Sequence, residues 1–256
     1  MDSLNGKIAL VTGGSRGIGR GISERLAADG ALVAVHYGSD ESAAADTVAA
    51  IEAAGGQAFA VRAQLGSGNG DVATLFDVLD RDLLARTGAT HIDILVNNAG
   101  ISAFADLAAT SPELYDELFA INTRAPFFIA QAATVRMGDG GRIIAISSGV
   151  TQRAQPTLLA YSMSKAALDV MGHTLAKELA PRGITVNTVA ASLVDTDMNA
   201  AWLRTSEEAK AQAASVSAFN RLGEPRDIAD VVAFIASDDA RFITGHYLDA
   251  TGGSLL

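Results

Sequence analysis

The chain has 256 residues, of which 49% are apolar and 19% are charged; this composition supplies a large buried core and excludes a disordered chain. Its net charge of −10 argues against a nucleic acid or an anionic membrane as a partner, and no charge-free stretch of about 18 residues could span a bilayer. Cysteine is absent and the four histidines lack ligand-like spacing, so disulfides and thiolate catalysis are excluded and we expect no metal site.

The first element is a short apolar run followed by a cluster of glycines. Residues 7–12 are typical of a strand buried on both faces, and the glycine-rich segment 13–19 follows directly. Apolar residues at helical spacing from Ile18 to Leu26 then predict a helix. Because glycines admit close approach of a pyrophosphate and a helix N-terminus offers free N–H groups, this order predicts a dinucleotide site. A tight turn without a ligand is the alternative.

Strands and helices alternate along the rest of the chain. Further strands are expected over residues 32–37, 58–62, 92–96, 141–146, 185–190 and 245–249, and helices over 40–54, 71–86, from 112 past 126, 161–180 and 225–237. No repeat or linker interrupts this order. The sequence therefore predicts an α/β fold: one Rossmann-type, doubly wound domain over residues 1–256, with a seven-stranded parallel sheet flanked by helices.

The end of the second strand indicates which dinucleotide is bound. NAD-binding proteins of this architecture commonly carry an acid there for the ribose hydroxyls, whereas this chain has Tyr37, Gly38 and Ser39, with Arg16 in the glycine segment. A cation and a hydroxyl suit a 2′-phosphate, and Asp40 is expected in the next helix turn. NADP(H) is the expected cofactor, with NAD(H) as the alternative.

Two helices carry the candidate chemistry. Tyr161 and Lys165 are four residues apart and share a helix face, where a cation would favour the phenolate and lower the pKa of the tyrosine. An ordinary half-buried tyrosine beside a solvated lysine is the alternative. In the preceding helix, Pro126 should distort the backbone and leave groups free near Asn122.

These motifs together resemble the short-chain dehydrogenase/reductase family, and the likeness runs from about Lys7 to Gly253. The matching features, in chain order, are Thr12-Gly13-x-x-x-Gly17-x-Gly19, Asn97-Asn98-Ala99-Gly100, Asn122, Ser148, Tyr161-x-x-x-Lys165, Arg221-Leu222-Gly223-x-Pro225 and Leu248-Asp249-x-x-Gly252-Gly253. Ser148 is preferred to Ser147 because it lies thirteen residues before Tyr161, as in the family pattern.

The resemblance implies a role for each of four residues. Tyr161 would protonate a carbonyl oxygen or deprotonate an alcohol, and Lys165 would lower its pKa and hold the nicotinamide ribose. Ser148 would hydrogen-bond the substrate oxygen, and Asn122 would hold a water that relays protons to Lys165. Hydride transfer belongs to the nicotinamide.

The resemblance also implies the residues that bind the cofactor. They are Gly13, Ser15, Arg16, Gly17, Ile18, Gly19, Tyr37, Gly38, Ser39, Gln64, Leu65, Asn98, Ala99, Gly100, Tyr161, Lys165, Val194 and Thr196. Two positions depart from the family pattern. Gln64 stands where an aspartate usually holds the adenine amino group, and Ala191-Ser192 replaces a Pro-Gly pair near the nicotinamide.

The sequence does not identify the substrate. Residues 102–104, 149–158 and a lid at about 192–220 are expected to face it, and they mix polar and apolar types. We expect NADP(H)-dependent hydride transfer with a free carbonyl or secondary alcohol. The alternatives are a 3-oxoacyl-[acyl-carrier-protein] reductase, whose acidic carrier an acidic chain would steer poorly, and a non-catalytic NADP-binding sensor or scaffold.

Location and assembly are further expectations. The polar N-terminus lacks the pattern of a signal peptide, so the sequence predicts a soluble, cytoplasmic protein. The resemblance implies a homo-oligomer, a tetramer or a dimer, formed through the Asn122 and Tyr161 helices and the last helix and strand.

Overall fold

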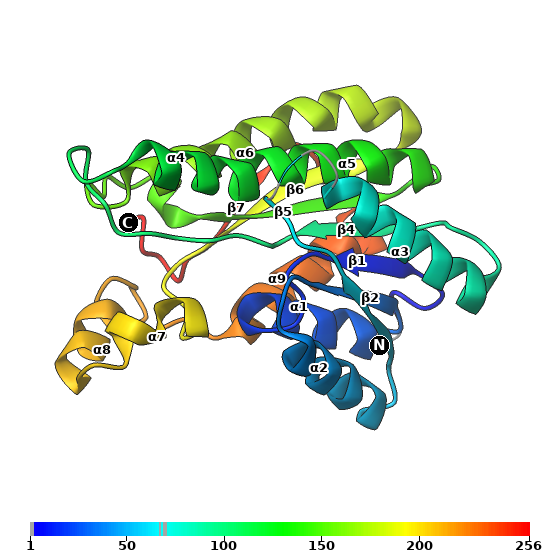
Figure 1. Ribbon diagram of the computed structural model, residues 1–256, viewed down its shortest axis with the longest axis horizontal. Coiled ribbons are helices and arrows are strands. Elements are labelled where there is room, and N and C mark those ends of the chain that lie inside the picture. Colours follow the sequence, from blue (N-terminus) through cyan, green and yellow to red (C-terminus); the bar gives the residue numbers. More distant parts are fainter. Residues whose placement is uncertain (1–2, 67, 69–70) are drawn as a thin grey trace.

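Seven parallel strands form one sheet through the middle of the computed structural model (Figure 1). The structure describes residues 3–66, 68 and 71–256; residues 1, 2, 67, 69 and 70 of the predicted domain lie outside it. The strand order is β3-β2-β1-β4-β5-β6-β7, and every neighbouring pair is parallel. The strands are β1 (Ile8–Val11), β2 (Leu32–Tyr37), β3 (Gln57–Arg62), β4 (Ile94–Asn97), β5 (Arg142–Ser148), β6 (Thr185–Ala191) and β7 (Tyr247–Ala250). The predicted fold class is confirmed.

Helices cover both faces of this sheet (Figure 1). One layer consists of α1 (Gly17–Ala28), α2 (Glu41–Ala53) and α9 (Pro225–Ala236). The other consists of α3 (Asp71–Thr87), α4 (Pro112–Phe119), α5 (Ala125–Arg136) and α6 (Leu159–Leu179). The shorter elements are η1 (Ala120–Arg124), η2 (Gly149–Thr151), η3 (Ala180–Arg182), η4 (Asp238–Ala240), α7 (Asp197–Leu203) and α8 (Glu207–Ala214).

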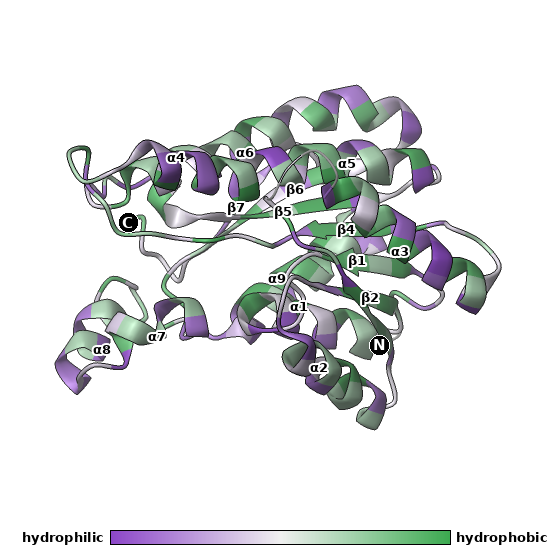
Figure 2. Cartoon of the chain, viewed as in Figure 1, coloured by the Kyte–Doolittle hydropathy of each residue, from purple (hydrophilic) through white to green (hydrophobic). Residues whose placement is uncertain are grey.

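Strands β1 to β6 contribute side chains to two cores, because successive residues point to opposite faces of a sheet. Val11 packs with Ile22 of α1 in one core, whereas its neighbour Leu10 packs with Leu79 of α3 in the other. All four are fully buried. Burial on both faces explains why the central strands β1 and β2 are largely apolar, as Figure 2 shows, and why they were recognisable in the sequence.

The predicted helix distortion near Asn122 is confirmed, and it is a π-helical turn. The helix that starts at Pro112 is divided by η1, in which the Ala125 N–H donates to the carbonyl of Ala120, five residues earlier. Pro126 explains the change of pattern, because it has no N–H to donate to the carbonyl of Asn122, four residues earlier. The sequence therefore places an irregular backbone at the residue predicted to relay protons.

The strand order changes direction between β1 and β4, and a crevice opens at the carboxyl ends of these strands. β5 and β6 extend slightly further than expected, because Ser148 pairs with Ala191. Beyond this edge, α7 and α8 of the predicted lid project from the body of the molecule (Figure 1). No helix in the described ranges is long and apolar enough to cross a membrane.

Candidate active site

The glycine segment turns from β1 into α1 through backbone conformations that favour glycine. Gly13 has φ +60° and Gly17 has φ +53°. At Gly19 a Cβ atom would lie 2.0 Å from the Gly13 carbonyl oxygen, so no side chain fits there. The N-terminus of α1 has no side-chain cap from the described residues and no acidic residue in its first turn. Residues 16–19 line the pocket, so the free N–H groups of this N-terminus are suited to an anion.

Two side chains hold this turn against the sheet. The Asn98 Nδ2 donates to the carbonyls of Thr12 and Gly13 at 2.8 and 3.0 Å, and the Thr12 hydroxyl accepts from the Asn98 and Ala99 amides. His36 was not predicted: its Nδ1 accepts from the Gly13 N–H at 3.0 Å. The only signal for His36 was a polar residue inside an apolar strand.

The end of β2 has the arrangement expected for a 2′-phosphate. Gly38, Ser39 and Arg16 line the same pocket, and Arg16 is exposed and makes no ion pair with any described residue. Asp40, the nearest acid, caps α2 by accepting from the Ala43 N–H at 3.0 Å. One oxygen of its carboxylate therefore caps the helix in whose first turn the sequence places it, although Asp40 also lines the pocket.

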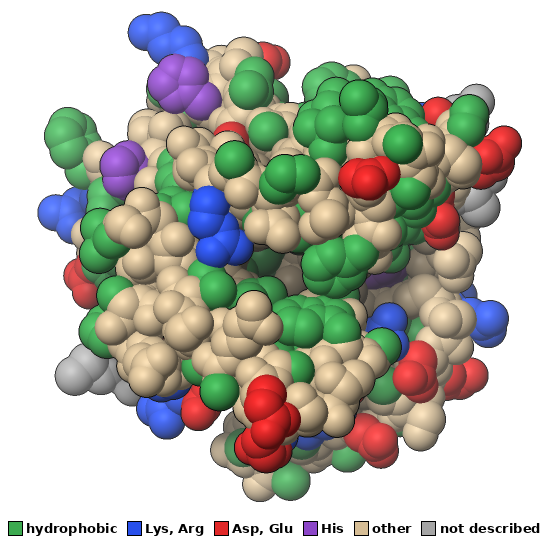
Figure 3. Space-filling view, turned by 90° about the vertical axis from the view of Figure 1, so that its left-hand side faces the viewer, with side chains coloured by type: hydrophobic (Ala, Val, Ile, Leu, Met, Phe, Trp, Pro, Cys, Tyr) green, Lys and Arg blue, Asp and Glu red, His purple; other side chains and the backbone are tan. Residues whose placement is uncertain are grey.

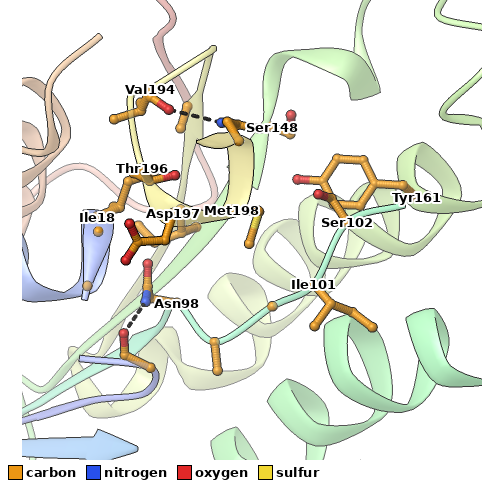
Figure 4. Close-up of a pocket in the computed structure, with 18 of the residues that line it drawn as sticks. Ile18, Asn98, Ile101, Ser102, Ser148, Tyr161, Val194, Thr196, Asp197 and Met198 are labelled. Atoms are coloured by element: carbon orange, nitrogen blue, oxygen red, sulfur yellow. Dashed lines mark hydrogen bonds between the residues drawn. The ribbon is translucent and has the colours of Figure 1, made fainter. Parts of the chain in front are cut away.

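The candidate catalytic side chains converge at the other end of this pocket. Ser148 is the last residue of β5, and Tyr161 lies in the first turn of α6, where its side chain points into the pocket (Figure 4). Part of Tyr161 stays open to the pocket, yet burial raises its pKa, while the facing Ser148 hydroxyl lowers it. Burial is the largest cause and raises this pKa, so the expected lowering by Lys165 stays a prediction.

Lys165 is itself almost completely enclosed. Only 5% of the residue is exposed, and its Nζ donates to the Ile146 carbonyl at 2.9 Å. Burial lowers the pKa of Lys165 to about 8, against the charge of Asp169, which raises it. A buried lysine that titrates this close to neutrality is typical of a functional site.

Asn122 lies behind the pocket and does not line it. It is fully buried; its Oδ1 accepts from the Ile101 N–H, and its Nδ2 donates to the Ile101 carbonyl and the Ser164 hydroxyl. Since the side chain is fully engaged, a relay at this residue would use the backbone carbonyl freed by Pro126. Its amide also fixes Ile101 beside the Gly100 backbone, where a Cβ atom would lie 3.1 Å from the Lys165 Nζ.

The pocket has a volume of about 850 Å³ and connects all these groups. It is lined by every residue predicted for the cofactor and by Ser148, and it continues towards the expected substrate-facing segments and the lid. Figure 4 shows Asn98, Ile18 and Thr196 across the pocket from Tyr161, and Figure 3 shows the hollow with hydrophobic side chains along its rims. Its shape and donors fit an extended dinucleotide with space for a substrate.

Two features of the substrate end were not predicted in detail. Phe104 and Trp202 form an edge-to-face pair across the pocket, with ring centroids 5.9 Å apart. The replaced Pro-Gly pair is accommodated because Ala191 extends β6 and the Ser192 hydroxyl donates to that of Ser254 at 3.3 Å. A single tryptophan in a polar segment was the only sequence signal for the aromatic pair.

Comparisons with known proteins agree with this geometry. A family model described as enoyl-(acyl carrier protein) reductase matches residues 13–254. A solved structure of the promiscuous reductase LugOII, which catalyses keto-reduction at C1 during lugdunomycin biosynthesis, is 52% identical, covers 99% of this chain and 100% of that one, and has a TM-score of 0.95. The landomycin C-6 ketoreductase LanV, solved with bound NADP and rabelomycin, is 49% identical with a TM-score of 0.91, over 99% and 98% of the two chains.

A curated relative extends the likeness to fungi. Versicolorin reductase 1 of Aspergillus parasiticus is 37% identical over 98% of this chain and 97% of its own. Identity at this level over nearly the whole chain, together with the site geometry, shows the family as well as the fold. The chain is an oxidoreductase of the short-chain dehydrogenase/reductase family.

Proposed function

We propose that the protein is an NADPH-dependent ketoreductase that reduces a ketone on a polycyclic aromatic compound of polyketide type. The observation that carries this proposal is one continuous pocket in which a dinucleotide groove, the Ser148–Tyr161–Lys165 group and the Phe104–Trp202 pair follow one another. Relatives that share half of the sequence are a landomycin C-6 ketoreductase and a reductase that catalyses keto-reduction in lugdunomycin biosynthesis. A hydroxynaphthalene reductase, named for a fused aromatic ring system, is 38% identical. Two aromatic rings set at right angles offer the contacts that a flat, fused-ring substrate prefers.

The cofactor we propose is NADP(H). Arg16 and Ser39 would hold the 2′-phosphate, and the α1 N-terminus would hold the pyrophosphate. Gln64 would accept from the adenine amino group, and Val194 and Thr196 would lie near the carboxamide. When bound, the nicotinamide supplies the hydride.

Three side chains of the protein would act on the ketone. The Ser148 hydroxyl would donate a hydrogen bond to the ketone oxygen, and Tyr161 would donate the proton that this oxygen takes up as the alcohol forms. Burial raises the pKa of Tyr161, so the phenol carries its proton at neutral pH, as a proton donor must. The Lys165 ammonium would stabilise the phenolate left behind. The Lys165 ammonium would then return a proton to Tyr161, and a water held by the Asn122 backbone carbonyl would pass a proton from solvent to Lys165.

The test is an NADPH-oxidation assay with three substrate classes. A fused-ring aromatic ketone should be reduced most efficiently, ahead of small aliphatic ketones and of an acetoacetyl thioester that mimics the acyl carrier. Highest kcat/KM on the thioester would instead favour the carrier-protein reductase. The Tyr161→Phe variant should lose turnover by at least about a hundredfold while its Kd for NADPH is unchanged. A wild type that binds NADPH and turns over nothing in a broad panel would favour the sensor alternative.

We also propose that the chain forms a homo-oligomer, a dimer or a tetramer. Large apolar side chains are exposed on adjacent helices of one layer: Phe127 (50% exposed) and Phe128 (39%) on α5, and Val170 (67%) on α6. Phe127 and Phe128 pack edge to face, so the surface they present is ordered. Such a face on a monomer is typical of a protein interface.

A further inference from the structure

A carboxylate lies behind the proposed proton-transfer group. Asp169 follows Lys165 by one helical turn on α6, so the two side chains share a helix face. Both carboxylate oxygens of Asp169 are buried, and neither makes a hydrogen bond of ordinary geometry to a residue within the described ranges. The buried hydroxyl of Ser147, next to the proposed substrate-binding Ser148, likewise makes no hydrogen bond of ordinary geometry to a described residue. A buried charge without strong local partners is costly, and its presence calls for a compensating role.

The groups around Asp169 connect it to the strand end that carries Ser148 and to Lys165. The hydroxyls of Ser147 and Thr151 face the carboxylate closely enough to oppose the rise in its pKa that burial causes, and Lys165 opposes it as well. The Thr151 hydroxyl also donates to the Ser148 carbonyl at 3.1 Å. One carboxylate therefore faces a hydroxyl of β5, a hydroxyl of η2 and the charge on Lys165.

Few other charges compete with this pair. On β7, Tyr247 donates to the Ser148 carbonyl at 3.4 Å; burial, with smaller contributions from Asp169 and Asp249, raises its pKa, so it stays neutral. On α6, His173 is exposed and its ring contacts the Gly245 carbonyl. The η1 turn contributes the neutral Asn122 amide. Among the described residues, Asp169 is thus the anion whose charge raises the pKa of Lys165.

We propose that Asp169 is a positioning residue of the active site, which keeps Lys165 in its ammonium form at the working pH and fixes the turn that carries Ser148. The proposal rests on the proposed ketoreductase function, because the charge on Lys165 matters only if it stabilises the Tyr161 phenolate. The physical reason is simple: Lys165 is buried enough to lose its proton near pH 8, and an opposite charge one turn away delays that loss.

The test compares Asp169→Asn with Glu178→Gln, which removes the same charge from an exposed position on the same helix. The pH midpoint of Lys165 is measured without turnover, by competitive acetylation with acetic anhydride and mass spectrometry of the Lys165 peptide. Asp169→Asn should lower this midpoint by about one pH unit, and the alkaline limb of kcat/KM should fall at correspondingly lower pH. Asp169→Glu should restore most of the shift, and Glu178→Gln should match wild type.

A purely structural role would give a different result. If Asp169→Asn lowered activity equally at all pH values and left the acetylation midpoint of Lys165 unchanged, the proposal would be wrong while the ketoreductase function stood. If the midpoint shifted but no ketone were reduced by the wild type, the effect of Asp169 on Lys165 would stand and the proposed function would fail. Thermal unfolding of each variant confirms that the folded protein is being compared.

Discussion

The ring of His36 accepts a hydrogen bond from Gly13, the first residue of the glycine turn. Nδ1 lies 3.0 Å from the Gly13 amide nitrogen, and Nε2 lies 2.9 Å from the Ala63 carbonyl oxygen. Because Nδ1 accepts, Nε2 carries the proton and donates to Ala63, and the ring is neutral. A protonated ring would place a second N–H against that of Gly13. Burial accordingly lowers the pKa of His36 to about 4.

This histidine should make stability depend on pH. In the unfolded chain His36 titrates near ~6.5, so between pH 6.5 and 4 the unfolded state binds a proton that the folded state refuses. The contribution of the neutral His36 ring to the free energy of unfolding is fully present above pH 6.5. It is lost as pH falls towards 4, and the complete loss is about 3 kcal/mol. In urea unfolding, His36→Asn should be less stable than wild type at pH 7, and the difference should narrow at pH 5. His173→Asn, at an exposed ring, should follow wild type; a constant gap for His36→Asn would contradict the assignment.

The preference for NADPH should depend on Arg16. This guanidinium is exposed at the pocket and pairs with no described carboxylate, so a 2′-phosphate would gain a charged hydrogen bond of about 1.5–3 kcal/mol. Arg16→Ala should therefore raise KM for NADPH by about 10- to 100-fold and leave KM for NADH unchanged. The matched control is Arg20→Ala, since Arg20 pairs with Glu24 on α1. An equal rise in KM for NADPH and NADH would show that Arg16 does not bind the 2′-phosphate.

The proton relay can be tested at Pro126 without touching a reacting group. Pro126→Ala supplies an N–H that can bond to the Asn122 carbonyl, four residues earlier, and so occupy the acceptor proposed to hold water. We expect kcat to fall by about tenfold with little change in KM for NADPH or in thermal stability, since the Asn122 side chain keeps its three bonds. An unchanged kcat in a variant that has lost the π turn would exclude a relay through this carbonyl.

Much of this site was predictable because its parts are local in sequence. The order of a strand, a glycine segment and a helix predicts the turn at Gly13. The family spacing places Ser148 and Tyr161 on neighbouring elements. The sequence could not show which groups meet from distant segments. His36 meets Gly13 across two strands, and Trp202 meets Phe104 through the fold of the lid. The direction of the Tyr161 pKa also follows from burial, which only packing decides.

The exposed apolar face of α5 and α6 gives a test of assembly. Val170→Asp and Phe127→Asp would place a carboxylate in any interface built on this face, and a buried unpaired charge is strongly unfavourable. Light scattering at micromolar concentration should show an oligomer for the wild type and a smaller species for both variants. Leu84→Asp, at a leucine of α3 that is 56% exposed, is the control and should assemble as wild type does. A monomeric wild type would refute the proposal.

The aromatic pair at the mouth of the pocket should decide which ketones are reduced. Phe104 is 59% exposed, so it is available to a ligand, whereas Trp202 comes from the lid and completes the pair only when α7 is in place. Aromatic contacts of this kind contribute about 0.5–1.5 kcal/mol each, which corresponds to about 2- to 10-fold in binding. Phe104→Leu and Trp202→Leu should therefore lower kcat/KM for a fused-ring ketone by such factors and leave a small aliphatic ketone unaffected.

The control for this prediction is Phe119→Leu. Phe119 stacks on Tyr115 at 4.4 Å, and neither residue lines the pocket, so the variant removes an aromatic contact of similar size without touching the substrate path. If Phe104→Leu and Trp202→Leu reduced the rate on both classes of ketone equally, the pair would serve to hold the lid. A loss confined to the fused-ring ketone would assign the rings to substrate recognition, because only a flat substrate can use both of them.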